Sequence, residues 1–128
     1  MRVSFSEIVE KTNGWIDLRD VTAGVERAVK RENVSSGLAL VYAMCEETAV
    51  VTLEAEMALI LDTAEMISRL VKDTRTESRG EVAAALLGTH LAVPIAEGFL
   101  DLGTWQQIML VDLGKAGEKK VLVQIVSE

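Results

Sequence analysis

The residues of this sequence that could do chemistry near neutral pH are one histidine and a group of glutamates. His90 is the only histidine among the 128 residues. Neutral imidazole is a common zinc ligand and the usual proton shuttle at this pH, but one histidine without a nucleophile motif makes no Ser/His/Asp triad. Glu46, Glu47, Glu54 and Glu56 form a local acidic cluster, which indicates either a cation site of hard oxygen ligands or a solvated acidic rim.

Cys45 and the net charge reduce the number of functions and partners that fit this sequence. Cys45 is the only cysteine, follows an apolar run and has no histidine near it in sequence, so we expect an inert packed thiol rather than a nucleophile. A single cysteine forms no internal disulfide, which is typical of the reducing cytoplasm. The 20 Asp and Glu against 13 Lys and Arg give a net charge of −7, so we expect neither nucleic acid nor an anionic membrane as a partner.

The sequence also predicts neither a membrane span nor a signal peptide. The longest apolar stretch, from Val82 to Ile95, is interrupted by Gly88, His90 and Pro94 and is shorter than the roughly 20 residues of a spanning helix. The first residues lack a continuous apolar segment and reach Glu7 early. We therefore expect a cytoplasmic protein.

The elements that must position these residues follow from the spacing of apolar side chains. Alternation and β-branched runs predict strands, and apolar residues three and four apart predict helices. The predicted strands cover residues 3–9, 15–18, 38–45, 48–53, 91–95, 99–102, 105–111 and 119–126, and the predicted helices cover residues 21–31, 56–72 and 81–87.

Several residues suggest how these elements begin, end and pair. Asn13-Gly14 predicts a hairpin between the first two strands. Asp20 and Thr22 are possible N-caps of the first helix, and Gly88 lies where the third helix should end. Pro94 cannot donate to a ladder, so its strand should lie at an edge or carry a bulge.

The predicted architecture is a single α+β domain over residues 1–128. Strands and helices are mixed without regular alternation and several strands are joined by short turns, which favours a mostly antiparallel or mixed sheet, sandwich-like, packed with two to three helices. The length fits one domain, and no linker, repeat or low-complexity tract divides it.

The C-terminal third carries the most specific motif. It runs through Gly88-Thr89-His90 and an alternating apolar stretch to Gly98, and then reaches Gly103-Thr104-Trp105-Gln106. This arrangement resembles the YjbQ-like family of secondary thiamin-phosphate-synthase-like proteins, with His90 at the family's serine position. Asp20-Val21-Thr22 and Ser36-Gly37 also resemble family segments, so the resemblance extends over nearly the whole chain.

The resemblance implies a site that this chain has altered. The family's histidines, near a subunit boundary of what is implied to be a trimer, are thought to bind a metal or an anion, and a thiamin phosphate synthase side activity is ascribed to the family. The residues that match two of those histidines are Glu46 and Glu81, and the loop over 72–80 contains no replacement. The family's Asn-Glu falls on Glu54-Ala55, which displaces its carboxylate.

Two hypotheses follow from this exchange. The first is a non-catalytic homo-oligomer, by the resemblance a homotrimer, that is a scaffold or binds a small ligand through Thr48, Gly103, Thr104, Trp105 and Gln106, with no cofactor. The second is a thiamin phosphate synthase-like enzyme acting on a phosphorylated small molecule, in which Glu46, Glu81 and His90 are the catalytic residues and hold a divalent metal. Trp105 alone fits either a pocket floor or a buried packing role.

Overall fold

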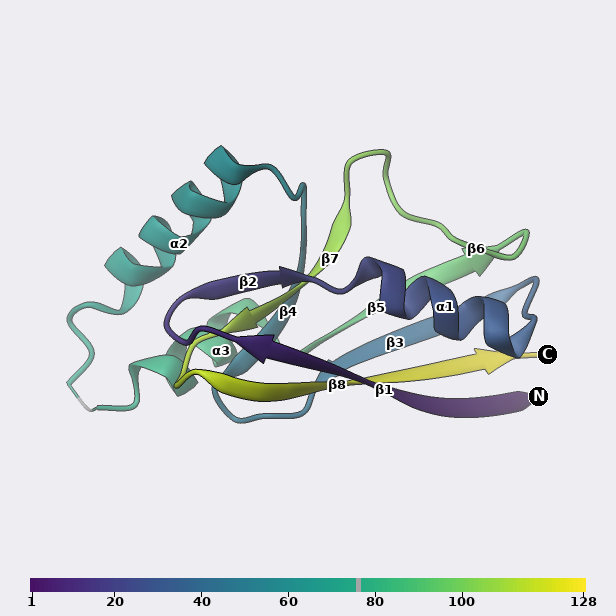
Figure 1. The fold of residues 1–128 in the computed structure, drawn as a ribbon, viewed down its shortest axis with the longest axis horizontal. Helices are drawn as coiled ribbons and strands as arrows, with labels where there is room; N and C mark the ends of the chain where they lie inside the picture. Colours follow the sequence, from purple (N-terminus) through teal and green to yellow (C-terminus); the bar gives the residue numbers. More distant parts are fainter. Residues whose placement is uncertain (76) are drawn as a thin grey trace.

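The computed structural model describes residues 1–75 and 77–128, which form two antiparallel sheets and three helices (Figure 1). The elements are β1 (Arg2–Thr12), β2 (Asp17–Asp20), α1 (Thr22–Glu32), β3 (Gly37–Ala43), β4 (Thr48–Leu53), α2 (Met57–Val71), α3 (Arg79–Leu87), β5 (His90–Ala96), β6 (Phe99–Leu100), β7 (Gln107–Asp112) and β8 (Gly117–Ser127). The five-stranded sheet has the order β1-β8-β3-β5-β6, and the three-stranded sheet has the order β2-β7-β4. The predicted α+β class is confirmed.

The main core lies between the two sheets and is closed by α1. Val25 and Val29 of α1 pack with Val41 and Val123 of the five-stranded sheet and with Leu110 of the three-stranded sheet. These side chains come from the predicted apolar stripe of α1, whose other face carries charged residues. The inner face of the five-stranded sheet is thus buried at β8 and β3, whereas inward-facing residues of β1, such as Ile8, and Leu91 of β5 are only partly buried.

A second core lies on the opposite face of the three-stranded sheet. Ala49 and Met109 from that sheet pack with Ile67 and Val71 of α2 and with Ala83 of α3. The molecule is therefore layered, from the five-stranded sheet through the three-stranded sheet to α2 and α3. No described element covers the outer face of the five-stranded sheet. No helix among the described residues is long and apolar enough to cross a membrane.

The predicted hairpin between the first two strands is wrong. β1 pairs with β8 along its whole length, whereas β2 pairs with β7 in the other sheet. The Asn13-Gly14 segment bends the chain from one sheet to the other. The backbone N–H of Trp15 donates to the Gly114 carbonyl at 2.9 Å, in the turn that leads from β7 in one sheet to β8 in the other. Gly14 takes a φ of +88° at this bend, which glycine adopts without strain.

Burial in β3 and α2 is less complete than their apolar sequences predict. The nearly continuous apolar run over residues 38–45 predicts a buried strand, but the side chains of β3 alternate between buried and exposed, because only one face of its sheet is covered. In α2 only Ile67 and Val71 of the predicted stripe are fully buried, and Met57 and Leu61 are exposed. Both elements thus present apolar side chains to the surface of the single chain.

The prediction that the strand of Pro94 lies at an edge or carries a bulge is wrong, because β5 lies between β3 and β6 and pairs with β3 without a break in register. The edge strand is β6, but it pairs only with Ile95 and Ala96 of β5. The Pro94 carbonyl accepts a hydrogen bond from the Asp101 backbone N–H at 2.8 Å, so the main chain of Pro94 points away from β3. The missing N–H of proline therefore costs no ladder bond with β3.

Candidate functional site

A groove separates β4 from β5 at the open edges of the two sheets. It encloses about 550 Å³, and its lining includes Thr52 of β4, Leu87 of α3, His90 of β5, and Asp101 and Gln106 from the loop before β7. A volume of this size lies within the range of small-molecule and peptide sites, roughly 300–1,000 Å³. We refer to it below as the strand-edge groove.

Gly88 fixes one end of the strand-edge groove. It ends α3 with a φ of +102°, and its N–H donates to the Ala84 carbonyl at 2.9 Å. Its own carbonyl accepts from the Val50 backbone N–H at 3.1 Å, which joins β4 to the start of β5. Beyond this bond the two strands separate, and the groove opens between them.

The other end of the groove is built by the turn over Gly103, Thr104, Trp105 and Gln106. The Gln106 N–H donates to the Gly103 carbonyl at 3.0 Å, and the Gly103 N–H donates to Oε1 of Gln106 at 2.8 Å. The Gln106 side chain therefore holds its own turn closed. Trp105 is 70% exposed, so in the single chain the buried packing role is wrong.

A second hollow of about 390 Å³ lies on the far side of this turn. Trp105 and Thr104 line it together with Thr22 and Glu26 of α1. An exposed indole beside a carboxylate can receive a neutral or cationic ring by stacking and cation–π attraction. The turn thus separates two hollows of different character.

The Asp20-Val21-Thr22 segment is connected to the same region by hydrogen bonds. Asp20 accepts from the Thr22 N–H at 3.0 Å and hydroxyl at 2.6 Å, and from Nε2 of Gln107 at 2.8 Å. The Thr22 hydroxyl oxygen accepts from the Ile108 N–H at 2.8 Å. The N-cap position of α1 is Val21 rather than Asp20 or Thr22, and no side chain caps it. This motif binds α1 to β7, a role that sequence reasoning missed.

The three candidates for a rebuilt catalytic site are all exposed. Glu46 lies in the turn between β3 and β4, Glu81 in the first turn of α3, and His90 at the start of β5 opposite Tyr42. Within residues 1–75 and 77–128, no group of three His, Cys, Asp or Glu side chains could hold a metal ion. The single chain therefore does not bring Glu46, Glu81 and His90 together as a ligand set.

One residue of the acidic cluster and one candidate ligand contact take part in local structure. Glu56 caps α2, where its carboxylate accepts from the N–H groups of Ala58 and Leu59 at 3.1 and 3.2 Å. Thr48, a candidate ligand contact, is fully buried, and its hydroxyl donates to the Cys45 carbonyl at 2.6 Å. Both residues are occupied by local structure.

A buried ion pair near the β7–β8 turn was missed by sequence reasoning. Asp112 is 0% exposed and its Oδ2 lies 3.1 Å from Nζ of Lys119, whose side chain is 14% exposed. The Thr12 hydroxyl donates to the same oxygen, and the Gly114 N–H donates to Oδ1 at 3.0 Å. The sequence feature that could have indicated this pair is the carboxylate of Asp112, which comes immediately after the apolar residues of β7.

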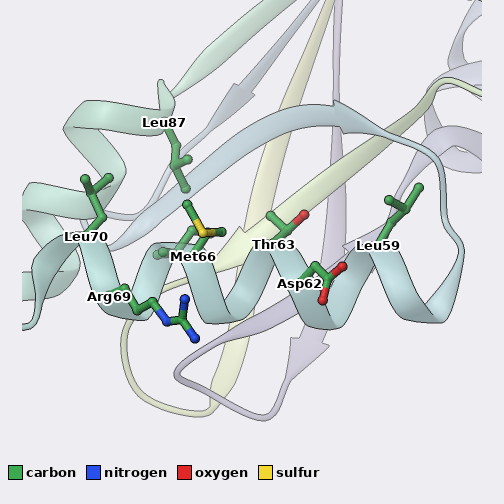
Figure 2. A pocket seen from close by; sticks show the side chains of 8 residues that line it. Leu59, Asp62, Thr63, Met66, Arg69, Leu70 and Leu87 are labelled. Carbon is green, nitrogen blue, oxygen red and sulfur yellow. The ribbon is translucent and has the colours of Figure 1, made fainter.

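α2 carries a third hollow, of about 530 Å³, on its surface. Leu59, Met66 and Leu70 of α2 line it with Leu87 of α3, and Asp62 and Arg69 flank it (Figure 2). Arg69 donates to Glu65 at 2.9 Å, an exposed pair worth little stability. The lining is apolar apart from these charges and Thr63.

Comparison with known proteins adds the family context. The model of the family described as UPF0047 protein YjbQ-like matches residues 6–128. A UPF0047 protein of Archaeoglobus fulgidus is 34% identical over 126 residues, covering 92% of this chain and 98% of that protein. A YbjQ-like protein of unknown function from Sulfolobus solfataricus superposes with a TM-score of 0.93 at 29% identity, covering 99% of both chains. A hypothetical protein from Aeropyrum pernix superposes with a TM-score of 0.93 at 27% identity, covering 98% of this chain and 99% of that one.

Proposed function

Because the chain belongs to the YjbQ-like UPF0047 family, we propose that it is a non-catalytic, homo-oligomeric scaffold of that family. The observation that carries the proposal is the apolar outer face of the five-stranded sheet. The resemblance described above makes three the expected number of copies.

The outer face is formed by the side chains that alternate with the buried ones. The register of the sheet places them in rows across β1, β8, β3 and β5, so that they form one continuous surface. Phe5, for example, is 65% exposed and lies beside Gln124 of β8. The outer face comprises Val3, Phe5, Leu38, Leu40, Tyr42, His90, Ala92, Pro94, Leu122, Gln124 and Val126.

The size and charge of the outer face suit a second copy of the chain. Four strands spaced ~4.8 Å apart, with a rise of ~3.3 Å per residue, span on the order of 550 Å² in projection. This is the same order as the ~800 Å² that each partner buries in a standard interface. Glu7 and Lys120, which border the face, lie 3.8 Å apart and offset one another, so two chains of charge −7 can meet there without charge repulsion at the contact.

The non-catalytic part of the proposal rests on the residues at the positions of the family histidines. Glu46 and Glu81 are exposed carboxylates. A carboxylate replaces imidazole poorly as a proton shuttle near neutral pH, and two of them repel a phosphorylated substrate unless a metal intervenes. The small-ligand alternative is supported by the hollow beside Trp105, whose exposed indole offers a stacking surface.

We predict that Leu38→Glu reduces the mass in solution from a multiple of the chain to that of a single chain. Leu38 lies on the outer face, and burying an unpaired carboxylate in an interface costs several kcal/mol, about 10³-fold or more in association. Light scattering at micromolar concentration measures the mass, and circular dichroism verifies that the variant is folded.

Leu61→Glu is the matched control, because Leu61 is 61% exposed but lies on α2, on the far side of the molecule. It should keep the wild-type mass. A wild-type protein that scatters as one chain contradicts the oligomer, and dissociation by Leu61→Glu but not by Leu38→Glu contradicts the choice of face.

Metal uptake separates the scaffold from the alternative enzyme. We expect no stoichiometric binding of Zn²⁺, Mn²⁺ or Fe²⁺ after incubation and desalting, and no difference between the wild type and the double variant Glu46→Ala, Glu81→Ala. Elemental analysis of both proteins is the measurement. Stoichiometric uptake by the wild type that the double variant loses, with turnover of a thiamin precursor, would instead establish a metal-dependent enzyme.

A further inference from the structure

The strand-edge groove lies between two strand edges that lack a partner. β4 is the last strand of the three-stranded sheet, and β5 is covered only at Ile95 and Ala96 by β6. Open edges present rows of main-chain donors and acceptors, which other chains recognise by adding a strand. Here two such edges border one cavity of about 550 Å³.

The hydrogen bonds already made show which main-chain groups face the groove. On β5, the Pro94 carbonyl accepts from Asp101 on the side away from β3, so Ala92, two residues earlier, points its N–H and C=O the same way. On β4, the Val50 N–H donates to Gly88 on the side away from β7, so Thr52 also points outward. Among the described residues, neither Ala92 nor Thr52 has a main-chain partner on this side.

The two edges also have a compatible direction. β4 and β5 both start near the bond between Val50 and Gly88 and run away from α3, which Figure 1 shows as two diverging strands. A single extended chain that enters the groove in the opposite direction would be antiparallel to both. It could then donate to and accept from Ala92 on one side and Thr52 on the other.

The side chains around the groove define the chemistry of such a chain. Buried Val50 and Val93 line its depth and favour small apolar side chains at alternate positions. Asp101 is an exposed carboxylate on its wall, and the chain as a whole carries a charge of −7. Charge complementarity therefore favours a basic residue at the intervening positions.

We propose that the strand-edge groove binds an extended, basic and apolar peptide segment of another protein by strand addition, antiparallel to both β4 and β5. The bound segment joins the two sheets through its backbone amides. A repeating backbone matches two parallel rows of donors and acceptors better than a compact small molecule does. A second copy of this chain is less suitable, because it has a net charge of −7 and would face Asp101, which no Lys or Arg in the described lining of the groove offsets.

The experiment is selection from random heptapeptides displayed on phage, with the full chain as the target, followed by calorimetry of an enriched peptide. Ala92→Pro removes the outward N–H without affecting the ladder with β3, as Pro94 already does two residues later. Binding should weaken about tenfold in Ala92→Pro, which corresponds to one lost hydrogen bond, and should be unchanged in Ala92→Ser. N-methylation of alternate peptide amides should weaken binding similarly, and the amide hydrogens of Ala92 and Thr52 should exchange more slowly in the complex.

Three results would overturn the proposal. One is the absence of any peptide enriched on the wild type over Ala92→Pro. Another is equal affinity of the enriched peptide for Ala92→Pro and Ala92→Ser. The third concerns hydrogen exchange in the absence of peptide. If the Ala92 and Thr52 amides are protected in the wild type and lose that protection in the dissociated Leu38→Glu variant, a second copy of the chain occupies the groove. The mass of each variant is measured in parallel, so failure of the oligomer and failure of the groove are distinguishable.

Discussion

Replacing Asp112 with alanine is expected to lower the free energy of unfolding by about 3–5 kcal/mol. The Asp112 carboxylate is 0% exposed and accepts from Lys119, the Thr12 hydroxyl and the Gly114 N–H. Removing it leaves the Lys119 ammonium partly buried without its counter-charge and frees the donors that close the β7–β8 turn. The loss is therefore much larger than that of a surface ion pair.

Urea unfolding at a fixed protein concentration measures this change, since assembly makes apparent stability depend on concentration. Asp101→Ala, which removes an exposed carboxylate, is the control and should change stability by about 0.5 kcal/mol or less. Adding Lys119→Met to Asp112→Ala should recover part of the loss, because no unpaired charge remains. A loss below about 1 kcal/mol in Asp112→Ala contradicts the pairing described here.

Gly37→Ala is the second substitution with a large expected effect, about 3 kcal/mol. A methyl group at Gly37 would lie 2.3 Å from the Val126 carbonyl oxygen and 3.2 Å from Cα of Ser127. Both obstacles are backbone atoms of β8, the central partner of β1 and β3, so the new methyl group must displace the pairing of Gly37 with Ser127. Thermal and urea unfolding report the loss.

Gly103→Ala provides the comparison for Gly37→Ala. The nearest atom to a methyl group at Gly103 is Oε1 of Gln106 at 3.0 Å, at the end of a flexible side chain that can move. We expect a cost of about 1 kcal/mol or less at this position. Equal losses from the two substitutions would show that contact with the β8 backbone is not the cause.

Local sequence patterns predicted the helices and strands well. The arrangement of the strands in the sheets depends instead on pairing between residues far apart in the sequence. The periodicity over residues 21–31 and 56–72 predicted α1 and α2 to within a residue at each end. The hairpin prediction was wrong because Asn13-Gly14 indicates only that the chain turns. The strand that pairs with β1 is β8, which lies at the opposite end of the sequence. Nothing within a local window contains that information.

The candidate site also has features that the sequence predicted and features that it did not. The resemblance drew attention to the turn over Gly103 and Gln106, which does form the wall between two hollows. The pairing of Asp112 with Lys119 and Thr12 joins three strands, so a charged residue after an apolar run could not be assigned a partner in advance. The strand-edge groove was equally hidden, because it exists only where two sheets separate.

The position of β8 has a consequence for synthesis of the chain on the ribosome. β8 emerges from the ribosome after the other described strands, yet it lies in the interior of its sheet, between β1 and β3. Until it is translated, the longest ladder of the fold cannot form, and the nascent polypeptide holds β1 without its partner. The domain therefore cannot complete its fold before β8 has been synthesised, and a nascent chain that lacks β8 exposes an unpaired β1 edge to which chaperones can bind.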